Sequence, residues 1–293
     1  MNYEPLLLSH QQRVDGILKP LGLGISDYNF VNLWLWRHSR RIELAFEMGF
    51  LVVRLTYPDR PPVMLMPVGQ EDLAALLTQI KDHCESRGEV MAFRALSETM
   101  RTDLEACWPD RFEFVHTPCH DDYLYSVQAL IELKGRAYHS KKNFVNRFIS
   151  THGLDFGPIR ADEEGAVIAF LERWFAKAPY ASDAERQGIV DLLKQRDSFA
   201  GCSYGVLRDQ ERVIGFSVGE ALGEKVVGIH VEKADSDYAG AYQVINQAHL
   251  QTFWSDFEVV NREEDLGIEG LKKAKLSYKP IGFVTKYNAT LRG

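Results

Sequence analysis

Three adjacent carboxylates in the C-terminal part of the chain have the types and the setting for chemistry. Glu263, Glu264 and Asp265 follow a short apolar run at 257–260 and precede a helical pattern. The carboxyl end of a strand beside a cleft is a usual place for a functional side chain. One carboxylate could bind the amino group of a donor or act as a base toward an acceptor amine. The alternative is that all three only complement the dipole of the following helix.

A helical pattern at 240–254 places three amide side chains on one face. Gln243, Asn246 and Gln247 have the i, i+3 and i+4 spacing that aligns side chains along a helix. Such amides orient a polar ligand when the helix begins at a cleft, or they satisfy backbone groups of neighbouring strands when they are buried. The spacing fits both interpretations. His230, in the apolar run before this helix, is more typical of a packed histidine than of a catalytic base.

Two basic segments interleave cations with aromatic residues. One is LKKAKLSYKP at 271–280, and the other is KGRAYHSKKNFVNR at 134–147. Cations hold phosphates and aromatic rings stack on unpaired bases, so both segments suit the single-stranded end of a tRNA without reading its sequence. The alternative is a solvated helix face. The nucleic-acid hypothesis rests on four cations of the second segment, Arg136, Lys141, Lys142 and Arg147.

The composition is that of an ordinary globular protein. Hydrophobic residues make up 45% of the 293 positions, enough for one large domain or two smaller ones. A formal charge of -7 argues against a surface that is basic throughout. The four cysteines are widely spaced and no His, Asp and Glu set has the spacing of metal ligands, so the sequence predicts neither a disulfide framework nor a metal site. The apolar runs at 31–36 and 50–55 are too short to cross a membrane, and the N-terminus lacks the basic region of a signal peptide, so we expect a cytoplasmic protein without a transmembrane segment.

The elements that must position these residues occur in the same order twice. In each half, three strand-like runs precede a helix, a strand, a second helix and a final strand. In the C-terminal half a helix at 182–199, with Ser182 as its N-cap, comes before them. The other elements of that half are expected at 204–209, 213–222, 225–234, 240–254, 257–260, 266–277 and 283–287. Those of the N-terminal half are expected at 41–46, 50–57, 62–68, 72–88, 90–95, 97–107 and 112–117, with further helices at 126–135, 138–151 and 162–178.

This repetition predicts a mixed α/β (α+β) protein with two tandem GNAT-like lobes, which have the fold of the acyl-CoA N-acyltransferases. In that fold two central parallel strands separate, and the donor enters the gap between them. The predicted N-terminal lobe, 1–125, is structural, because its matching helix start at 68–70 carries no cluster of polar residues. The predicted C-terminal lobe, 126–293, holds the candidate site. The fold alone does not define a function.

The turn before the helix at 240–254 bears on the donor. Acetyl-CoA-dependent enzymes of this fold hold a pyrophosphate with an Arg/Gln-x-x-Gly-x-Gly/Ala turn at a helix N-terminus. The matching stretch, SDYAGAYQ at 236–243, keeps one glycine, Gly240, and Asp235 and Asp237 place negative charge where the anion would lie. CoA is therefore disfavoured and no cofactor is required, although an acetyl-CoA-dependent N-acetyltransferase stays an alternative. The acidic residues would otherwise only cap the helix.

Longer blocks resemble a known bacterial family. The segments 123–148, 230–247 and 261–287, together with ISDYNFVNLWLWR at 25–37, are similar to the phosphatidylglycerol lysyltransferase C-terminal-type domain family, which is related to the Fem peptidyltransferases. The resemblance implies the tandem GNAT-like fold and the transfer of an aminoacyl group from aminoacyl-tRNA to an amine or hydroxyl of a lipid head group or peptide precursor. In the Fem enzymes a lysine in a similar terminal segment helps to stabilise charge on the transferred carbonyl, and Lys275 is the best match here.

The resulting hypothesis is an aminoacyl- or acyltransferase whose site lies in the C-terminal half. Lys275 and a backbone N–H near Val231 or Glu232 would stabilise the oxyanion, with Glu263, Glu264 or Asp265 as ligand or base. The alternative is a non-catalytic binding or scaffold protein with the same fold. An open, polar gap between the strands favours the enzyme, and a gap filled by aromatic side chains favours the scaffold. The predicted substrate-binding residues are Asn261, Arg262, Tyr238, Gly240, Gln243, Asn246, Gln247, Tyr278, Lys279 and His230.

Overall fold

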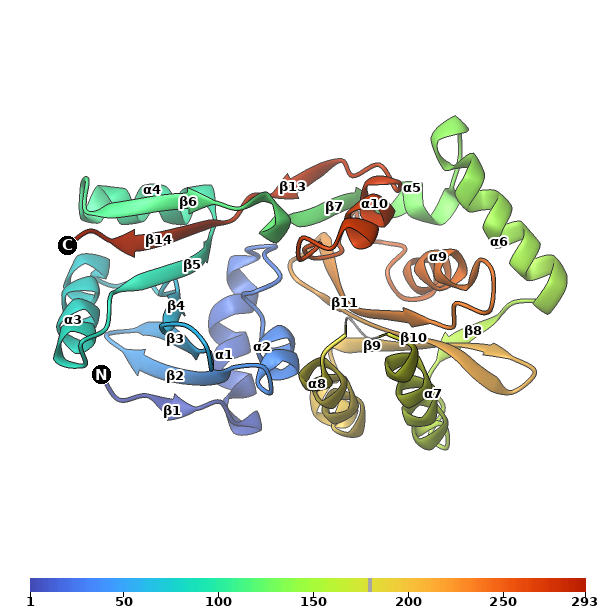
Figure 1. The fold of residues 1–293 in the computed structure, drawn as a ribbon, viewed down its shortest axis with the longest axis horizontal. Helices are drawn as coiled ribbons and strands as arrows, with labels where there is room; N and C mark the ends of the chain where they lie inside the picture. Colours follow the sequence, from blue (N-terminus) through green and yellow to red (C-terminus); the bar gives the residue numbers. More distant parts are fainter. Residues whose placement is uncertain (179–180) are drawn as a thin grey trace. The chain divides into compact units, whose positions relative to one another are not determined.

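The computed structural model of the chain describes residues 1–178 and 181–293. Their contacts divide the chain into two compact units, Met1–Asp122 with Val284–Gly293, and Tyr123–Phe283. Each unit is built on one seven-stranded sheet with helices packed against it (Figure 1). The prediction of a mixed α/β protein with two similar sheets is confirmed.

The first sheet consists, in spatial order, of β1 (Glu4–Pro5), β2 (Arg41–Glu47), β3 (Phe50–Thr56), β4 (Val63–Leu65), β5 (Ala92–Leu96), β14 (Tyr287–Leu291) and β6 (Phe112–His116). Its unit also contains the helices α1 (Gln11–Leu18), α2 (Phe30–Trp36), α3 (Leu73–Ser86) and α4 (Glu98–Cys107). Strands β2, β3 and β4 are antiparallel neighbours, whereas β4 and β5 run parallel and are joined through α3. Leu76, Leu77 and Ile80 are buried on one face of α3.

The second sheet consists, in spatial order, of β13 (Gly282–Val284), β7 (Asp122–Ser126), β12 (Val259–Asn261), β11 (Val226–Ala234), β10 (Arg212–Ala221), β9 (Cys202–Asp209) and β8 (Asp155–Pro158). Its unit contains the helices α5 (Val127–Glu132), α6 (His139–His152), α7 (Glu164–Lys177), α8 (Asp183–Lys194), α9 (Ala241–Phe253) and α10 (Glu269–Leu276). Strands β9, β10 and β11 form an antiparallel meander, and β11 and β12 run parallel. The predicted order of elements is therefore present in both units.

The two sheets exchange strands. β6 lies in the first sheet, but β7, which follows it in the chain, pairs with β12 in the second. β13 lies in the second sheet, but β14 pairs antiparallel with both β5 and β6 in the first. The sequence predicted one final strand at 283–287, whereas the structure has β13 at the start of that range and β14 beyond it. Each sheet is thus completed by a strand that follows the other sheet's edge strand.

Local backbone geometry sets the helix ends. The Ser182 Oγ accepts a hydrogen bond from the Glu185 N–H at 3.1 Å, so the predicted N-cap of α8 is confirmed. Helix α10 begins at Glu269 rather than at 266, because Leu266 and Gly267 have φ angles of 56° and 72°, outside the helical region. Among the helices within 1–178 and 181–293, none has the length and apolar character that crossing a bilayer requires.

Candidate functional site

Strands β11 and β12 are paired along only part of β11. The parallel pairs are Val226 with Val259, Val227 with Val260, and Gly228 with Asn261. β12 ends at Asn261, whereas β11 continues to Ala234. β11 therefore extends past the end of β12 beyond Gly228, and the predicted separation of the two strands stays a prediction. Charged side chains of β11 and of the turn after β12 lie beside this unpaired part of β11, which we call the gap.

Lys275 fixes the backbone of the turn that follows β12. Its side chain points inward from α10 with the residue 7% exposed, and its Nζ donates hydrogen bonds to the carbonyl oxygens of Arg262, Glu263 and Glu264. Glu263 has a φ angle of 58°, a left-handed conformation that carries strain in a non-glycine residue. The ammonium thus stabilises an unusual turn. This contact supports a positioning role for Lys275, and its predicted oxyanion role stays a prediction.

The turn directs the Glu263 carboxylate at a buried histidine. His230 Nδ1 lies 2.8 Å from Glu263 Oε1, and His230 Nε2 lies 3.3 Å from Glu220 Oε1 on β10. Burial lowers the pKa of His230, but the hydrogen bonds to Glu220 and Glu263 outweigh burial and raise the pKa to about 10. Both ring nitrogens are therefore protonated at neutral pH and donate to carboxylates. His230 is a buried cation here, which does not suit it to act as a base.

A second buried polar group crosses the gap. Arg262 Nη2 donates to Glu232 Oε1 at 2.7 Å, and Asn246 Nδ2 on α9 donates to Glu232 Oε2 at 3.0 Å. Two atoms of this group are buried without a hydrogen-bond partner in the described chain, Arg262 Nη1 and Asn246 Oδ1. Buried polar atoms are normally paired, with protein or with water. One donor and one acceptor beside Glu232 therefore lack a hydrogen-bond partner within the described chain.

Aromatic rings surround the Arg262 guanidinium. Its Cζ lies 5.0 Å from the centroid of the Tyr278 ring and 5.6 Å from that of Tyr125. Lys141 Nζ, from α6, lies 4.5 Å from the Tyr278 ring centroid. Burial and then the positive charge of Arg262 lower the pKa of Lys141. The gap is thus polar and cationic, but it is also partly filled by tyrosine side chains. It matches neither the open polar gap expected of the enzyme nor the aromatic-filled gap expected of the scaffold.

The other predicted carboxylates and amides face different partners. Asp265 is 1% exposed and accepts hydrogen bonds from the Tyr123 hydroxyl at 2.6 Å and the Gly267 N–H at 2.8 Å, so it holds the turn together. Asn261 is fully buried, and its Oδ1 accepts from the Glu263 N–H at 2.7 Å. Glu264 is half-buried at the end of this turn.

The three amides of α9 do not act as one set. Asn246 faces the gap, Gln243 hydrogen-bonds with Tyr278, and Gln247 donates to the Ile131 carbonyl oxygen on α5. Lys279, also predicted to bind substrate, is exposed beyond α10.

Gly240 begins α9 for a reason of packing. Its φ angle is 100°, and a Cβ added to it would lie 2.6 Å from the Phe144 carbonyl oxygen on α6. The glycine therefore allows close approach of two helices. Tyr238, just before it, packs with its ring centroid 5.1 Å from that of His152.

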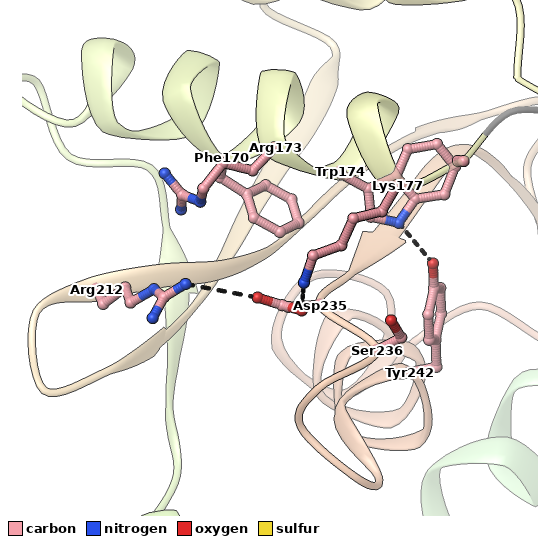
Figure 2. Close-up of a pocket in the computed structure, with 9 residues that line it drawn as sticks. Phe170, Arg173, Trp174, Lys177, Arg212, Asp235, Ser236 and Tyr242 are labelled. Carbon is pink, nitrogen blue, oxygen red and sulfur yellow. Dashed lines mark hydrogen bonds and ion pairs between the residues drawn. The ribbon is translucent and has the colours of Figure 1, made fainter.

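A cavity of about 150 Å³ adjoins this turn (Figure 2). Lys177 Nζ, from α7, lies 3.4 Å from Asp235 Oδ1 and 2.5 Å from Asp237 Oδ2. Arg212 Nη2 approaches Asp235 Oδ2 at 3.7 Å. The carboxylates of the turn are therefore already paired with two cations of the cavity, an arrangement unlike a free anion site. The sequence did not indicate this cavity, which is lined by Phe170, Arg173, Trp174, Lys177, Ala178, Arg212, Asp235, Ser236 and Tyr242.

The four predicted nucleic-acid contacts lie on α6 or directly before it. Lys142 and Arg147 are exposed on α6, and Arg136 is exposed in the short turn that precedes it. Lys141 instead points toward Tyr278 at the gap. The basic face of α6 therefore begins at the candidate site.

Two carboxylates of the site were missed by sequence reasoning. Glu220 and Glu232 hold His230 and Arg262, respectively; Glu220 was not predicted, and only the backbone N–H of Glu232 was considered. The available signal was a carboxylate inside an apolar strand pattern, as in VIGFSVGEAL and KVVGIHVEKA. A buried charge in such a strand needs a partner.

Comparison with a family model covers nearly the whole chain. The model described as "Phosphatidylglycerol lysyltransferase, C-terminal" matches residues 19–290. A curated relative, an uncharacterised protein of Mycoplasmoides gallisepticum, is 25% identical over 171 residues. That alignment covers 57% of this chain and 54% of the relative, so the chain spans about half the length of the curated relative it matches.

Solved structures show the same architecture. A conserved protein of unknown function from Bacteroides thetaiotaomicron matches with a TM-score of 0.92 at 30% identity, covering 100% of both chains. The C-terminal domain of a putative lysylphosphatidylglycerol synthetase from Agrobacterium fabrum matches with a TM-score of 0.68 at 15% identity, covering 97% of this chain and 92% of that one. FemX matches with a TM-score of 0.51 at 9% identity, covering 98% and 97%. The predicted tandem GNAT-like fold is confirmed.

Proposed function

Because the chain belongs to the phosphatidylglycerol lysyltransferase C-terminal family, we propose that its second unit transfers an aminoacyl group from an ester donor, an aminoacyl-tRNA, to an amine or hydroxyl acceptor. The acceptor is a lipid head group or a peptide precursor. The observation that carries this proposal is the gap beyond Gly228, where a buried donor atom and a buried acceptor atom lie without partners in the described chain.

The proposed reaction requires positioning and charge stabilisation more than a strong base. The acceptor nitrogen or oxygen attacks the ester carbonyl carbon, the bond from that carbon to the ribose oxygen breaks, and the ribose hydroxyl leaves with a proton. The ester is already activated, so orientation and a donor for the developing oxyanion supply most of the acceleration. We propose that Arg262 Nη1 donates to the carbonyl oxygen and that Asn246 Oδ1 accepts from the amino group of the aminoacyl donor, because both atoms lack a partner in the described chain.

Glu263 is the proposed acceptor of the proton that the nucleophile loses. Its side chain is 19% exposed, whereas the His230 side chain behind it is fully buried. Lys275 holds the turn that carries this carboxylate, so its proposed role is to position Glu263 and Arg262 together.

The surroundings of α9 support an aminoacyl-tRNA donor over acetyl-CoA. Asp235 and Asp237 are paired with Lys177, and the position of a Cβ on Gly240 is taken by α6. The exposed cations of α6 offer contacts for phosphates next to the gap. We therefore propose that no CoA takes part.

One observation favours the second candidate, a binding protein without catalysis. The rings of Tyr125 and Tyr278 lie 5.6 Å and 5.0 Å from the Arg262 guanidinium and occupy part of the gap. In that case the protein would bind the end of an aminoacyl-tRNA without cleaving its ester.

A transfer assay with labelled aminoacyl-tRNA separates these functions. The full chain is incubated with each aminoacyl-tRNA and with phosphatidylglycerol vesicles, a cell-wall peptide precursor or buffer alone, and acceptor-bound label and remaining ester are counted. Transfer supports the enzyme, and binding without ester loss supports the second candidate. Release of acetyl groups from acetyl-CoA in place of tRNA consumption would contradict the proposed donor.

The variant Arg262→Lys tests the role of the guanidinium. Lysine keeps the positive charge beside Glu232 but removes Nη1, so we expect transfer to fall about 100-fold, as when one oxyanion donor is lost. Arg54→Lys is the matched control, because Arg54 is a buried arginine paired with Glu43 and Glu89 in the first unit. Equal loss of activity in both variants, or full activity in Arg262→Lys, would remove Arg262 from the mechanism.

A further inference from the structure

Exposed apolar side chains concentrate around α10. Of the thirteen large hydrophobic side chains that are exposed in the described chain, five lie between residues 266 and 283. Large side chains exposed singly are ordinary, but a concentration of this kind marks a docking surface. The five, with their exposed fractions, are Leu266 (50%), Ile268 (37%), Leu276 (42%), Ile281 (61%) and Phe283 (48%).

Three exposed lysines lie among these side chains. Ile268, Lys272 and Leu276 are spaced by four residues, so they form one row along the surface of α10. Lys273 lies beside that row, and Lys279 follows in the turn after the helix. Glu269 is the one carboxylate between residues 266 and 283. The face thus carries net positive charge as well as apolar area, whereas Lys275 on the opposite side of α10 is buried.

The ends of this segment meet in the fold. The Phe283 ring centroid lies 5.0 Å from that of Tyr123, whose hydroxyl donates to Asp265 at 2.6 Å. The Ile268 N–H donates to the Asp265 carbonyl oxygen at 3.0 Å. Phe283 on β13 and the start of α10 are therefore joined through two side chains. We call residues 266–283 with these exposed side chains the α10 surface.

We propose that the α10 surface docks on a membrane that contains anionic lipids. Such a surface offers negative head groups for the lysines and an apolar boundary for the isoleucine, leucine and phenylalanine side chains. The same helix contacts the gap, because Lys275 on α10 donates hydrogen bonds to the backbone of Arg262 and Glu263. Docking there brings head groups of the lipid next to the proposed transfer site. This inference rests on the proposed function and selects a lipid head group as the acceptor.

Vesicle co-sedimentation of the full chain tests the docking. Vesicles are made of phosphatidylcholine alone or of phosphatidylcholine with phosphatidylglycerol, at several salt concentrations. We expect binding to the phosphatidylglycerol vesicles that weakens as salt rises, and little binding to the neutral ones. No binding to either, or equal binding to both at all salt concentrations, overturns the proposal.

Two variants and a control locate the surface. Lys272→Glu with Lys273→Glu reverses two charges, so the vesicle partition coefficient should fall more than about 25-fold, at about fivefold for each lysine lost. Ile281→Ser with Phe283→Ser should lower it at least about tenfold by removing apolar area. Leu7→Ser with Val115→Ser is the control, because both side chains lie in the first unit with similar exposed fractions of 54% and 49%. An equal loss in the control overturns the assignment.

A transfer readout separates failure of this inference from failure of the proposed function. The variant Ile281→Ser with Phe283→Ser should still consume aminoacyl-tRNA with a water-soluble glycerol phosphate acceptor, while losing transfer to phosphatidylglycerol vesicles. Arg262→Lys should do the reverse, binding vesicles while its transfer falls about 100-fold. Light scattering after size exclusion tests whether a second copy of the chain covers this surface instead. That would be the result if the wild-type chain dimerises, the Ile281→Ser with Phe283→Ser variant is monomeric, and neither protein binds vesicles. The membrane proposal would then be wrong.

Discussion

His230 and His249 are both buried in the second unit, and their surroundings shift the imidazole pKa in opposite directions. His249 on α9 has its ring nitrogens 2.9 Å from Ser203 Oγ and 2.6 Å from Ser217 Oγ, and burial lowers its pKa to about 3. His230 lies between two carboxylates, which raise its pKa to about 10. His249 is therefore neutral and His230 is a cation. Both are buried, so the neighbouring carboxylates rather than burial decide the charge of His230.

These pKa shifts predict the dependence of stability on pH. The folded state keeps the His230 proton up to about pH 10, while the unfolded chain loses it near 6.5, so this contribution is complete below pH 6.5 and declines as pH rises toward 10. The slope is at most about 1.4 kcal/mol per pH unit. Urea unfolding from pH 6.5 to 10 should show a steeper decline for the wild type than for His230→Gln.

His249 supplies the internal comparison for that measurement. Its folded-state pKa is depressed, so its contribution is present above pH 6.5 and is lost as pH falls toward 3. His230→Gln should leave the contribution of His249 itself unchanged. If the variant leaves the alkaline side as steep as in the wild type, the assigned charge state of His230 is wrong.

At the scale of elements, the N-terminus of α9 requires a glycine at its N-cap position, Gly240. Gly240 combines a φ angle of 100° with close contact to the backbone of α6. Gly240→Ala should therefore lower the free energy of unfolding by roughly 1–3 kcal/mol, the cost of one strained backbone position. Gly270→Ala is the control, because it lies in α10 with open space around it and should stabilise the chain by about 0.5–1 kcal/mol. Thermal unfolding of the two variants, with melting temperatures shifted in opposite directions, checks this assignment.

The sequence predicted most elements but not which sheet two of them join. Periodicity located β11, α9 and the cap of α8, because these depend on burial and local hydrogen bonds. Partner choice of a strand depends on distant residues, so the exchange of β7 and β14 could not be read from their own patterns.

The sequence indicated which segment carries the candidate site, but not which side chains contact one another there. The turn at 261–265 does lie at the gap and supplies Glu263 to His230. The second carboxylate on His230, Glu220, and the carboxylate on Arg262, Glu232, come from β10 and β11, which lie earlier in the chain. Lys275 was predicted as a site residue from the resemblance to the Fem enzymes. Its three carbonyl contacts depend on the left-handed backbone of Glu263, a conformation that glutamate does not favour and that the sequence therefore does not predict. The direction of a side chain in such a turn depends on tertiary contacts, so it cannot be predicted from the periodicity of the sequence.

At the scale of the whole molecule, the exchanged strand predicts how a truncated chain behaves. β14 lies between β5 and β6 and hydrogen-bonds with both. Removing residues 287–293 should therefore lower the protection of those β5 and β6 amides that face β14 in hydrogen exchange, while β9, β10 and β11 keep theirs. Truncation after Leu291 is the control and should leave all five strands protected. Loss of protection throughout both units would instead mean that they unfold as one.

The order of strands also bears on how the chain is made. During translation β5 and β6 leave the ribosome while the strand that will separate them has not yet been synthesised. Until residues 287–291 emerge, the nascent first sheet has open hydrogen-bonding edges, the kind that recruits other chains into aggregates. Ribosome-associated chaperones that cover those edges should therefore raise the yield of this protein.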